Sequence, residues 1–183
     1  MKIIAISGHA QNGKDTAADM LADIIRYDYN ERVLVAHYAD LVKYVCRTFF
    51  NWNGIKDEAG RTLLQYVGTD VVRTQEPDFW VNFIIKILKF FETHWDWVII
   101  PDTRFPNELQ ALRDNGFDVV HMRIERPGYD SGLTDAQKKH PSETAMDDSI
   151  PDIMIHNVSG LNFLREQLIS FAETFLAPPD VKV

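Results

Sequence analysis

The chain has 183 residues, 45% of them hydrophobic, which is sufficient for one well-buried core and predicts a single domain over 1–183. Its formal net charge of −8 argues against broad binding to a nucleic-acid backbone but is compatible with a local basic pocket for a small anion. With one cysteine, Cys46, it cannot form an intrachain disulfide, and it has no apolar run long enough to span a bilayer. We therefore expect a cytoplasmic protein, monomer or homodimer, with neither nucleic acid nor membrane among its partners.

Apolar runs and helical spacings alternate along the chain. Short apolar runs predict strands at 2–7, 33–36, 95–100, 119–124 and 152–156. Apolar residues at helical spacing predict helices at about 14–25, 41–50, 61–73, 78–91, 106–115 and 161–176. Strands that alternate with helices predict an α/β fold with a parallel sheet covered on both faces. In such a sheet ligands bind beyond the carboxyl ends of the strands.

Three further segments are expected to lie outside the strands and helices. Residues 51–60 are expected to form a polar loop, and 177–183 a loose tail. Residues 126–143 lack an apolar period, so they are expected to form a long loop of the kind that serves as a lid or is disordered. Asp40, at the end of the second strand, suits either a helix N-cap or a ligand contact.

The first strand leads into a glycine-bounded loop with the form of a phosphate-binding loop. Gly8 and Gly13 permit torsions that a side chain would forbid, so several N–H groups can point at one anion. Lys14 would reach the terminal phosphates of a nucleotide. The pattern G-x-x-x-x-G-K-[S/T] is not matched fully, because Asp15 takes the hydroxyl position and Thr16 follows it. Asp15 therefore either contacts hydrated magnesium or turns away. The predicted phosphate contacts are Gly8, Ala10, Gln11, Asn12, Gly13, Lys14, Asp15 and Thr16.

A second group of polar residues begins where the third strand ends. Asp102 is at the position where an acidic residue commonly holds hydrated magnesium in phosphate-loop enzymes. Arg104 follows, and its guanidinium could bridge phosphates in the transition state. The structural alternative is that Asp102 caps the next helix and that Arg104 pairs with Glu108.

Two further regions could bind a substrate. Arg61, Gln65 and Thr69 share one face of the predicted helix 61–73 and could hold a phosphate and a base edge. Spacing alone fits a solvated polar face better, and Trp80 is most simply a core residue, although it could stack on a base. In the loop 126–143, basic residues could close on phosphates and exclude water, with a solvated charge run as the alternative.

Taken in chain order, these motifs resemble those of the deoxynucleoside monophosphate kinases of bacteriophages, within the nucleoside monophosphate kinase branch of phosphate-loop proteins. The ordered set extends from Lys2 to about Leu168 and is more specific than any of its pieces. The pieces are Gly13-Lys14-Asp15-Thr16, Leu64-Gln65 with Gly68-Thr69-Asp70 and Arg73, Pro77-Asp78 with Trp80, Asp102-Thr103-Arg104-Phe105-Pro106-Asn107-Glu108, His140 with Ser142-Glu143, and Asp152 with Asn157.

The resemblance implies a three-layer α/β/α phosphate-loop kinase with a five-stranded parallel sheet. Its core would comprise 1–50, 94–125 and 150–176, with a helical acceptor-binding insertion at about 51–93 and a lid at about 126–143. The implied reaction transfers the γ-phosphate of ATP, with Mg²⁺, to a deoxynucleoside 5′-monophosphate, in the host cytoplasm if the chain is phage-encoded.

The resemblance also assigns roles to residues. Catalytic roles fall to Lys14, Asp15, Asp102 and Arg104, and magnesium contacts, mostly through water, to Asp15, Thr16 and Asp102. The acceptor would meet Asp40, Lys43, Arg61, Gln65, Thr69, Arg73 and Trp80. The lid would contribute Arg126, Lys138, Lys139, His140 and Glu143, and the nucleotide base would meet Asn157.

Two alternatives remain open from the sequence, and a third is excluded. Kinases of dephospho-coenzyme A or phosphomevalonate share the loop and the general fold but differ in the acceptor pocket. A nucleotide-binding regulator would bind ATP without acceptor-dependent turnover. A GTPase would need Asn-Lys-x-Asp after a strand, and no such tetrapeptide occurs. The sequence does not rank dGMP, dTMP, hydroxymethylated dCMP or dAMP as acceptors.

Overall fold

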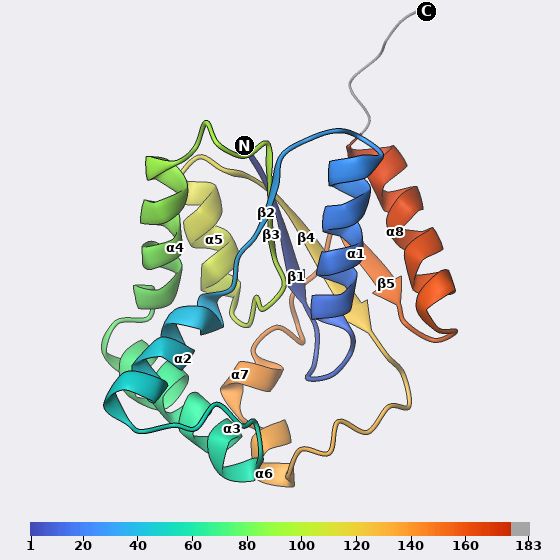
Figure 1. Ribbon diagram of the computed structural model, residues 1–183. Coiled ribbons are helices and arrows are strands. Elements are labelled where there is room, and N and C mark those ends of the chain that lie inside the picture. The colour runs from blue at the N-terminus through green and yellow to red at the C-terminus, as the bar shows by residue number, and fades with distance from the viewer. Residues whose placement is uncertain (177–183) are drawn as a thin grey trace, which may run out of the picture.

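The computed structural model describes residues 1–176, so the tail predicted at 177–183 lies outside the described residues. Five strands form one sheet in the order β2-β3-β1-β4-β5, and every neighbouring pair is parallel (Figure 1). The strands are β1 (Lys2–Ser7), β2 (Val33–Val35), β3 (Trp97–Ile100), β4 (Asp118–Glu125) and β5 (Ile153–His156). The five-stranded parallel sheet predicted from the sequence is confirmed.

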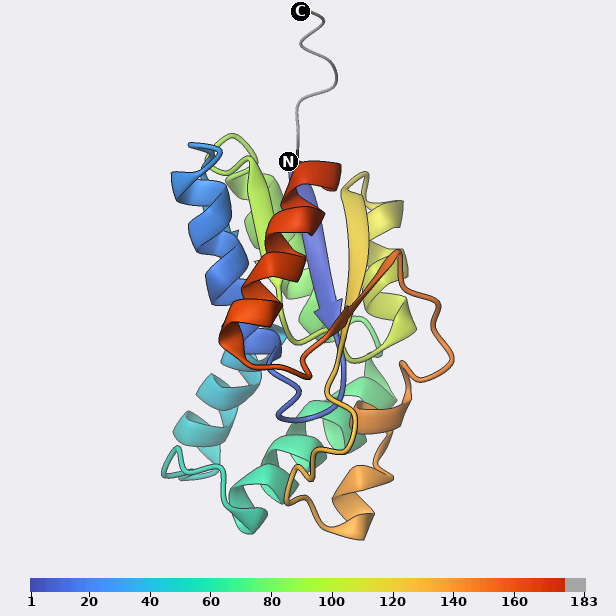
Figure 2. The same ribbon diagram turned by 90° about the vertical axis from the view of Figure 1, so that its right-hand side faces the viewer.

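Helices cover both faces of the sheet. On one face lie α1 (Lys14–Tyr27) and α8 (Leu161–Phe175), and on the other α4 (Phe79–Phe90) and α5 (Pro106–Asp114) (Figures 1 and 2). The central strand β1 is a continuous apolar run because both of its faces are buried. Ile4 and Ile6 point into the core beneath α1 and α8, whereas Ile3 and Ala5 point into the opposite core, and all four are fully buried.

The other helices gather beyond the carboxyl ends of the strands, at the lower end of the molecule in Figures 1 and 2. They are α2 (Tyr38–Phe49), α3 (Glu58–Gln65), the π-helix η1 (Tyr66–Arg73), α6 (Asp135–Lys138) and α7 (Pro141–Thr144). None of the helices in residues 1–176 is long and apolar enough to cross a membrane.

Three local predictions differ from the structure. The helix predicted at 61–73 is α-helical only to Gln65 and then widens into η1, a rare geometry that often occurs at functional sites. The loop predicted at 126–143 contains the one-turn helices α6 and α7, whose N-caps Thr134 and His140 accept from backbone N–H groups. Asp40 is not an N-cap, because α2 begins at Tyr38 and places Asp40 in its first turn.

Candidate functional site

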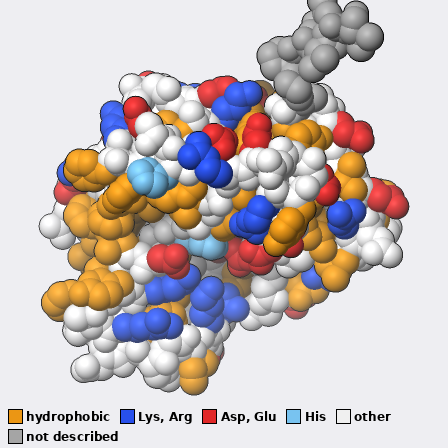
Figure 3. Space-filling model, turned by 45° about the horizontal axis from the view of Figure 1, so that its top comes forward, with side chains coloured by type: hydrophobic (Ala, Val, Ile, Leu, Met, Phe, Trp, Pro, Cys, Tyr) orange, Lys and Arg blue, Asp and Glu red, His pale blue; other side chains and the backbone are white. Residues whose placement is uncertain are grey.

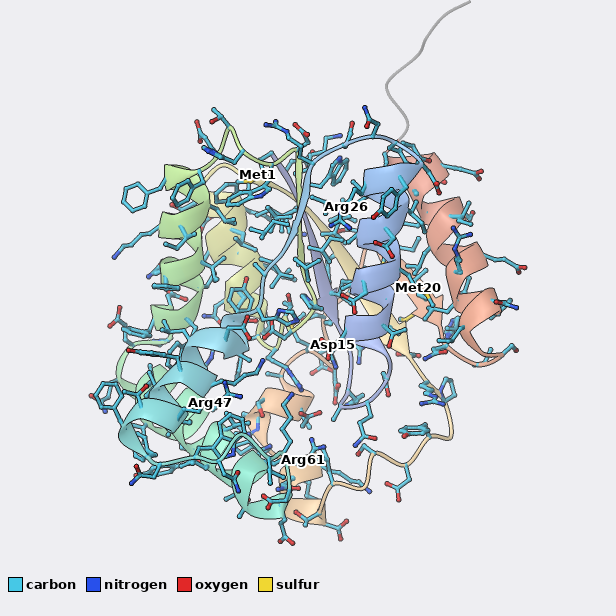
Figure 4. The ribbon with its side chains drawn as sticks, in the orientation of Figure 1. Met1, Asp15, Met20, Arg26, Arg47 and Arg61 are labelled. Carbon is cyan, nitrogen blue, oxygen red and sulfur yellow. The ribbon has the colours of Figure 1, made fainter. Side chains whose placement is uncertain are left out.

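A cavity of about 810 Å³ opens beyond the carboxyl ends of the strands. Its walls come from the loop 8–13, the start of α1, α2, the α3–η1 segment, the end of β3 and the segment 126–143. In Figure 4, Asp15 on the first turn of α1 and Arg61 on α3 mark two sides of this region. Figure 3 shows Lys and Arg side chains gathered beside histidine and acidic side chains on one face of the molecule.

The loop 8–13 has the geometry that its glycines predicted. Gly8 and Gly13 have φ of +137° and +95°, a range that side chains rarely tolerate. A Cβ at Gly8 would lie 2.3 Å from the Ile124 carbonyl oxygen, and one at Gly13 would lie 2.7 Å from Asn157 Nδ2. The loop therefore passes so close to β4 and to Asn157 that another residue at either glycine would be strained. Asn157 also donates to the Asn12 carbonyl at 3.1 Å, which anchors the loop.

The start of α1 offers positive charge. Its N-terminus has no side-chain cap, so its first N–H groups are available to an anion. Lys14 Nζ folds back and donates to the carbonyls of Gly8 and His9, both at 2.7 Å. Burial, followed by the charge of Arg104, lowers the pKa of Lys14 to about 7. An anion in the loop would oppose both effects, because it favours the charged lysine.

The carboxylate of Glu143, from α7, occupies part of the loop. Its Oε2 accepts the Ala10 N–H at 2.9 Å and its Oε1 accepts from Arg104 Nη1 at 2.5 Å. These are the two kinds of contact that a phosphate oxygen makes, an amide and a guanidinium. The family resemblance predicts Glu143 as a lid residue only. Its contact with Ala10 spans 133 residues, and no local pattern predicts it.

Asp102 holds α2 in place. Its oxygens accept the N–H groups of Tyr38 at 3.1 Å and Ala39 at 2.8 Å, so it caps α2 and not the helix that follows it. Burial raises the pKa of Asp102, and these donors oppose the shift. Glu108 contacts the backbone of Arg104 and not its side chain, because it accepts the Arg104 N–H at 2.7 Å. The Arg104 guanidinium pairs with Glu143 instead.

The α3–η1 wall contributes the polar groups predicted for it. Arg61, Gln65, Thr69 and Arg73 all line the cavity. Arg73 forms an ion pair with Glu108, whose side chain is 1% exposed, and stacks on the Phe105 ring at 4.0 Å. Burial raises the pKa of Glu108 to about 7, and the positive charge of Arg73 opposes the shift. Arg73 is thus held rigidly at the cavity wall.

Trp80, Lys43 and Asp40, three of the predicted acceptor residues, have their polar groups engaged by other parts of the protein. Trp80 lines the cavity but is 3% exposed, and its Nε1 donates to the Gly68 carbonyl at 2.8 Å, so it mainly holds η1 in the core. Lys43 lines the cavity and pairs with Asp40 at 2.8 Å. Asp40 itself is absent from the cavity lining, so its part is to orient Lys43.

The segment 126–143 is docked at both ends. Near its start, Tyr129 Oη donates to Gln11 Oε1 at 3.1 Å, and Arg126, which lines the cavity, stacks on the Tyr129 ring at 3.8 Å. Near its end, His140 Nε2 lies 3.0 Å from Asp70 Oδ1, and Gln137 donates to the Glu58 carbonyl at 3.2 Å. The predicted lid residues Lys138, Lys139 and His140 lie outside the cavity lining.

Three ionisable cavity residues were given no site role from the sequence, His37, Lys56 and Glu108. His37 Nε2 lies 3.5 Å from Asp15 Oδ1. This contact raises the pKa of His37 and lowers that of Asp15. His37 could have been found from its place just after the second strand. Lys56 lies in the segment 50–57, whose polar composition gave no such signal.

Comparisons with known proteins agree with this geometry. The chain matches the deoxynucleotide monophosphate kinase family over residues 24–168. The deoxynucleotide monophosphate kinase of Enterobacteria phage T4 is 34% identical over 119 residues, which are 63% of this chain and 46% of that protein. A putative deoxynucleotide monophosphate kinase of Acanthamoeba polyphaga mimivirus is 29% identical over 205 residues, 93% of this chain and 95% of that protein. The chain therefore matches about half the length of its phage T4 relative and nearly all of its mimivirus relative.

Solved structures show the same fold. The APS kinase of Mycobacterium tuberculosis in complex with AMPPNP and APS superposes with a TM-score of 0.55 at 12% identity, covering 96% of this chain and 98% of that chain. An unliganded sugar kinase from Janibacter sp. HTCC2649 superposes with a TM-score of 0.53 at 15% identity, covering 96% and 94%. These neighbours confirm the phosphate-loop kinase fold. The match over 24–168 shows that the chain belongs to the deoxynucleotide monophosphate kinase family.

Proposed function

We propose that this protein transfers the γ-phosphoryl group of ATP to the 5′-phosphate of a deoxynucleoside monophosphate. The observation that carries the proposal is the shared cavity, which an uncapped phosphate loop and a wall of fixed basic and amide groups line together. We call the loop 8–16 with Arg104 the donor half, and the segment 50–73 with Glu108 the acceptor half. Membership of the family supports the same reaction.

In the donor half, the N–H groups of the loop and of the first turn of α1 would bind the ATP phosphates. Lys14 would leave the carbonyls of Gly8 and His9 for the terminal phosphates. ATP must also displace Glu143, because a carboxylate on the Ala10 N–H and a phosphate would repel each other there. Donor binding would thereby free α7 and return Arg104 to the phosphates.

Magnesium fits the first turn of α1. Asp15 and Thr16 line the cavity, and the Asp15 side chain is 76% exposed, as a carboxylate needs to be if it binds the ion through water. When bound, the ion would neutralise charge on the β- and γ-phosphates. Asp102 fits a direct contact poorly, because both its oxygens accept backbone N–H groups, so we assign it to the positioning of α2.

In the transfer step, an oxygen of the acceptor 5′-phosphate forms a bond to the γ-phosphorus. The bond from that phosphorus to the β,γ-bridging oxygen breaks, and its electron pair leaves with ADP. Arg104, with two parallel donors, would neutralise charge that spreads over the γ-oxygens. The segment 126–143 would cover these groups from water, as a lid does.

In the acceptor half, Arg73 would bind the 5′-phosphate, because Glu108 and Phe105 hold its guanidinium in one orientation. Arg61, Gln65 and Thr69 would contact the rest of the nucleotide, with Asn157 nearer to the donor base. The insertion at about 51–93 would thus carry the acceptor, and the remainder of the domain would carry the donor.

The test is one panel of purified protein, ATP and magnesium with each deoxynucleoside monophosphate, dephospho-coenzyme A or phosphomevalonate, followed by ADP release. We expect turnover with at least one deoxynucleoside monophosphate and none with the other two acceptors. Lys14→Met is the matched inactive control. ATP binding without turnover on any acceptor would favour a regulator, and turnover only with dephospho-coenzyme A or phosphomevalonate would assign a different acceptor pocket.

A further inference from the structure

The segment 50–57, between α2 and α3, has a built structure although its sequence suggests only a polar loop. Trp52 is 8% exposed, and its Nε1 donates to the Ile55 carbonyl at 3.0 Å. The guanidinium of Arg47 lies over the Trp52 ring, 5.5 Å from its centroid. Gly60 fits beneath this turn, because a Cβ there would lie 2.1 Å from the Ile55 carbonyl oxygen. The turn is therefore packed in a single arrangement.

The backbone on both sides of Lys56 is fixed. Before it, the Ile55 N–H donates to Asn53 Oδ1 at 2.9 Å. After it, Asp57 caps α3 by accepting the Gly60 N–H at 2.8 Å. The carbonyl of Lys56 itself accepts from Arg61 Nε at 3.0 Å. The long, flexible side chain of Lys56 thus starts from a rigid point at the rim of the cavity, which it lines.

Unlike Lys43, Arg73 and Arg104, Lys56 is in no ion pair in the part of the chain that the structure describes, as is also true of Lys14, Arg61 and Arg126. Lys43 pairs with Asp40, and Arg104 pairs with Glu143. Arg61 uses its Nε for the Lys56 carbonyl. Among the described residues, Lys56 has no carboxylate within 4.0 Å of its ammonium. Its charge is therefore available to a bound anion.

Charges from both halves of the cavity act on Lys56. Burial, then the positive charges of Lys43, Arg61 and Arg104, lowers the pKa of Lys56, while the negative charge of Asp15 opposes the shift. Arg104 and Asp15 belong to the donor half, and Arg61 to the acceptor half. In the cavity lining, the exposed Lys56 side chain of the acceptor half thus shares one space with Asp15 and Arg104 of the donor half.

We propose that Lys56 is a catalytic residue, whose ammonium contacts the phosphoryl group as it passes from ATP to the acceptor phosphate. The inference rests on the proposed function. An ammonium is a compact charge with three donors on a flexible stem, so it can follow a group that moves between two fixed sites. The negative charge of a phosphoryl group would also offset the repulsion between Lys56 and the cations around it.

The test compares Lys56→Met with Lys56→Arg, and uses Lys86→Met on α4 as the matched control. Lys86 is exposed and lies outside the cavity lining, and its substitution by methionine removes the same charge. We expect Lys56→Met to lower kcat about 100-fold with the acceptor KM nearly unchanged, as for the loss of one transition-state donor. Lys56→Arg should recover part of kcat, and Lys86→Met should match the wild type.

A binding measurement separates the role of Lys56 from a general loss of activity. The probes are ADP with aluminium fluoride plus the accepted monophosphate, AMPPNP alone and the monophosphate alone. Lys56→Met should weaken binding of the first probe only. An increase in the acceptor KM alone, or unchanged kcat, would overturn the inference and leave the proposed function intact. A wild-type protein that phosphorylates no monophosphate would overturn both.

Discussion

The donor and acceptor halves of the cavity are assembled in different ways. The donor half takes most of its groups from consecutive residues, 8–16, on one strand–loop–helix unit. The acceptor half depends on contacts between distant segments, such as the ion pair of Arg73 with Glu108 and the hydrogen bond from Gln137 to the Glu58 carbonyl. A local motif thus suffices to bind an anion, whereas the second substrate needs a site made by tertiary packing. Mutations in the donor half and in the acceptor half should therefore impair the protein in different ways.

Arg104→Lys should give the largest effect, because it alters only the donor half during the transfer step. Lysine keeps the charge but loses the two-pronged geometry. Arginines in this role contribute ~10³-fold or more in related phosphoryl-transfer systems, so kcat should fall on that order while the acceptor KM changes little. Steady-state kinetics with both substrates varied is the measurement. A change confined to the acceptor KM would move Arg104 into the acceptor half.

Arg73→Met should affect both acceptor binding and stability. We expect the acceptor KM to rise about 10- to 100-fold, the usual contribution of hydrogen bonds to a charged group. At a pH above the pKa of Glu108 the variant should also lose up to about 3–5 kcal/mol of stability, because the buried Glu108 carboxylate would then lack its charged partner. The measurements are kinetics and denaturant unfolding.

The double variant Arg73→Met with Glu108→Gln serves as the control for that loss of stability. It removes the unpaired buried charge, so much of the stability should return while the high KM persists. If the KM returned together with the stability, Arg73 would be a structural residue and not an acceptor contact.

The same contrast explains how far the sequence could lead. The five strands, the loop 8–13 and Lys14 were predictable, because each depends on a run of neighbouring residues. The position of Glu143 on the Ala10 N–H was not, because it depends on a contact across 133 residues. The π-helical turn η1 was missed for a different reason. Its residues have the spacing of an ordinary helix, and a contact that accompanies it, from Trp80 Nε1 to the Gly68 carbonyl, comes from another helix, α4.

Glu143→Gln should have a smaller effect, and in the opposite direction, because it removes a charge that competes with ATP. Glutamine retains a carbonyl that can accept the Ala10 N–H but does not repel phosphate. We expect ATP to bind about 5- to 10-fold more tightly, which is at the low end of the usual range of coupling free energies. Calorimetric titration of AMPPNP is the measurement. Glu166→Gln, at an exposed position on α8 outside the cavity lining, is the matched control and should bind as the wild type does. Weaker binding in Glu143→Gln would indicate that the carboxylate stays in place and orients Arg104 for the donor.

The smallest expected signal is the uptake of a single proton by Lys14 when ATP binds. It tests whether Lys14 in the donor half is neutral before the nucleotide arrives. In the free protein the pKa of Lys14 is about 7, lowered first by burial, so at pH 8 most of its amine is neutral. Bound phosphates favour the charged form and raise that pKa. ATP binding at pH 8 should therefore be accompanied by the uptake of a fraction of a proton that approaches one, and binding at pH 6 by far less uptake at this group.

Titrations in two buffers of different ionisation enthalpy measure the uptake. Lys14→Met isolates the contribution of Lys14 from that of His37 and of ATP itself. Equal uptake by this variant and the wild type at pH 8 would show that Lys14 is already charged in the free protein, and that its contacts with the Gly8 and His9 carbonyls suffice to keep it so.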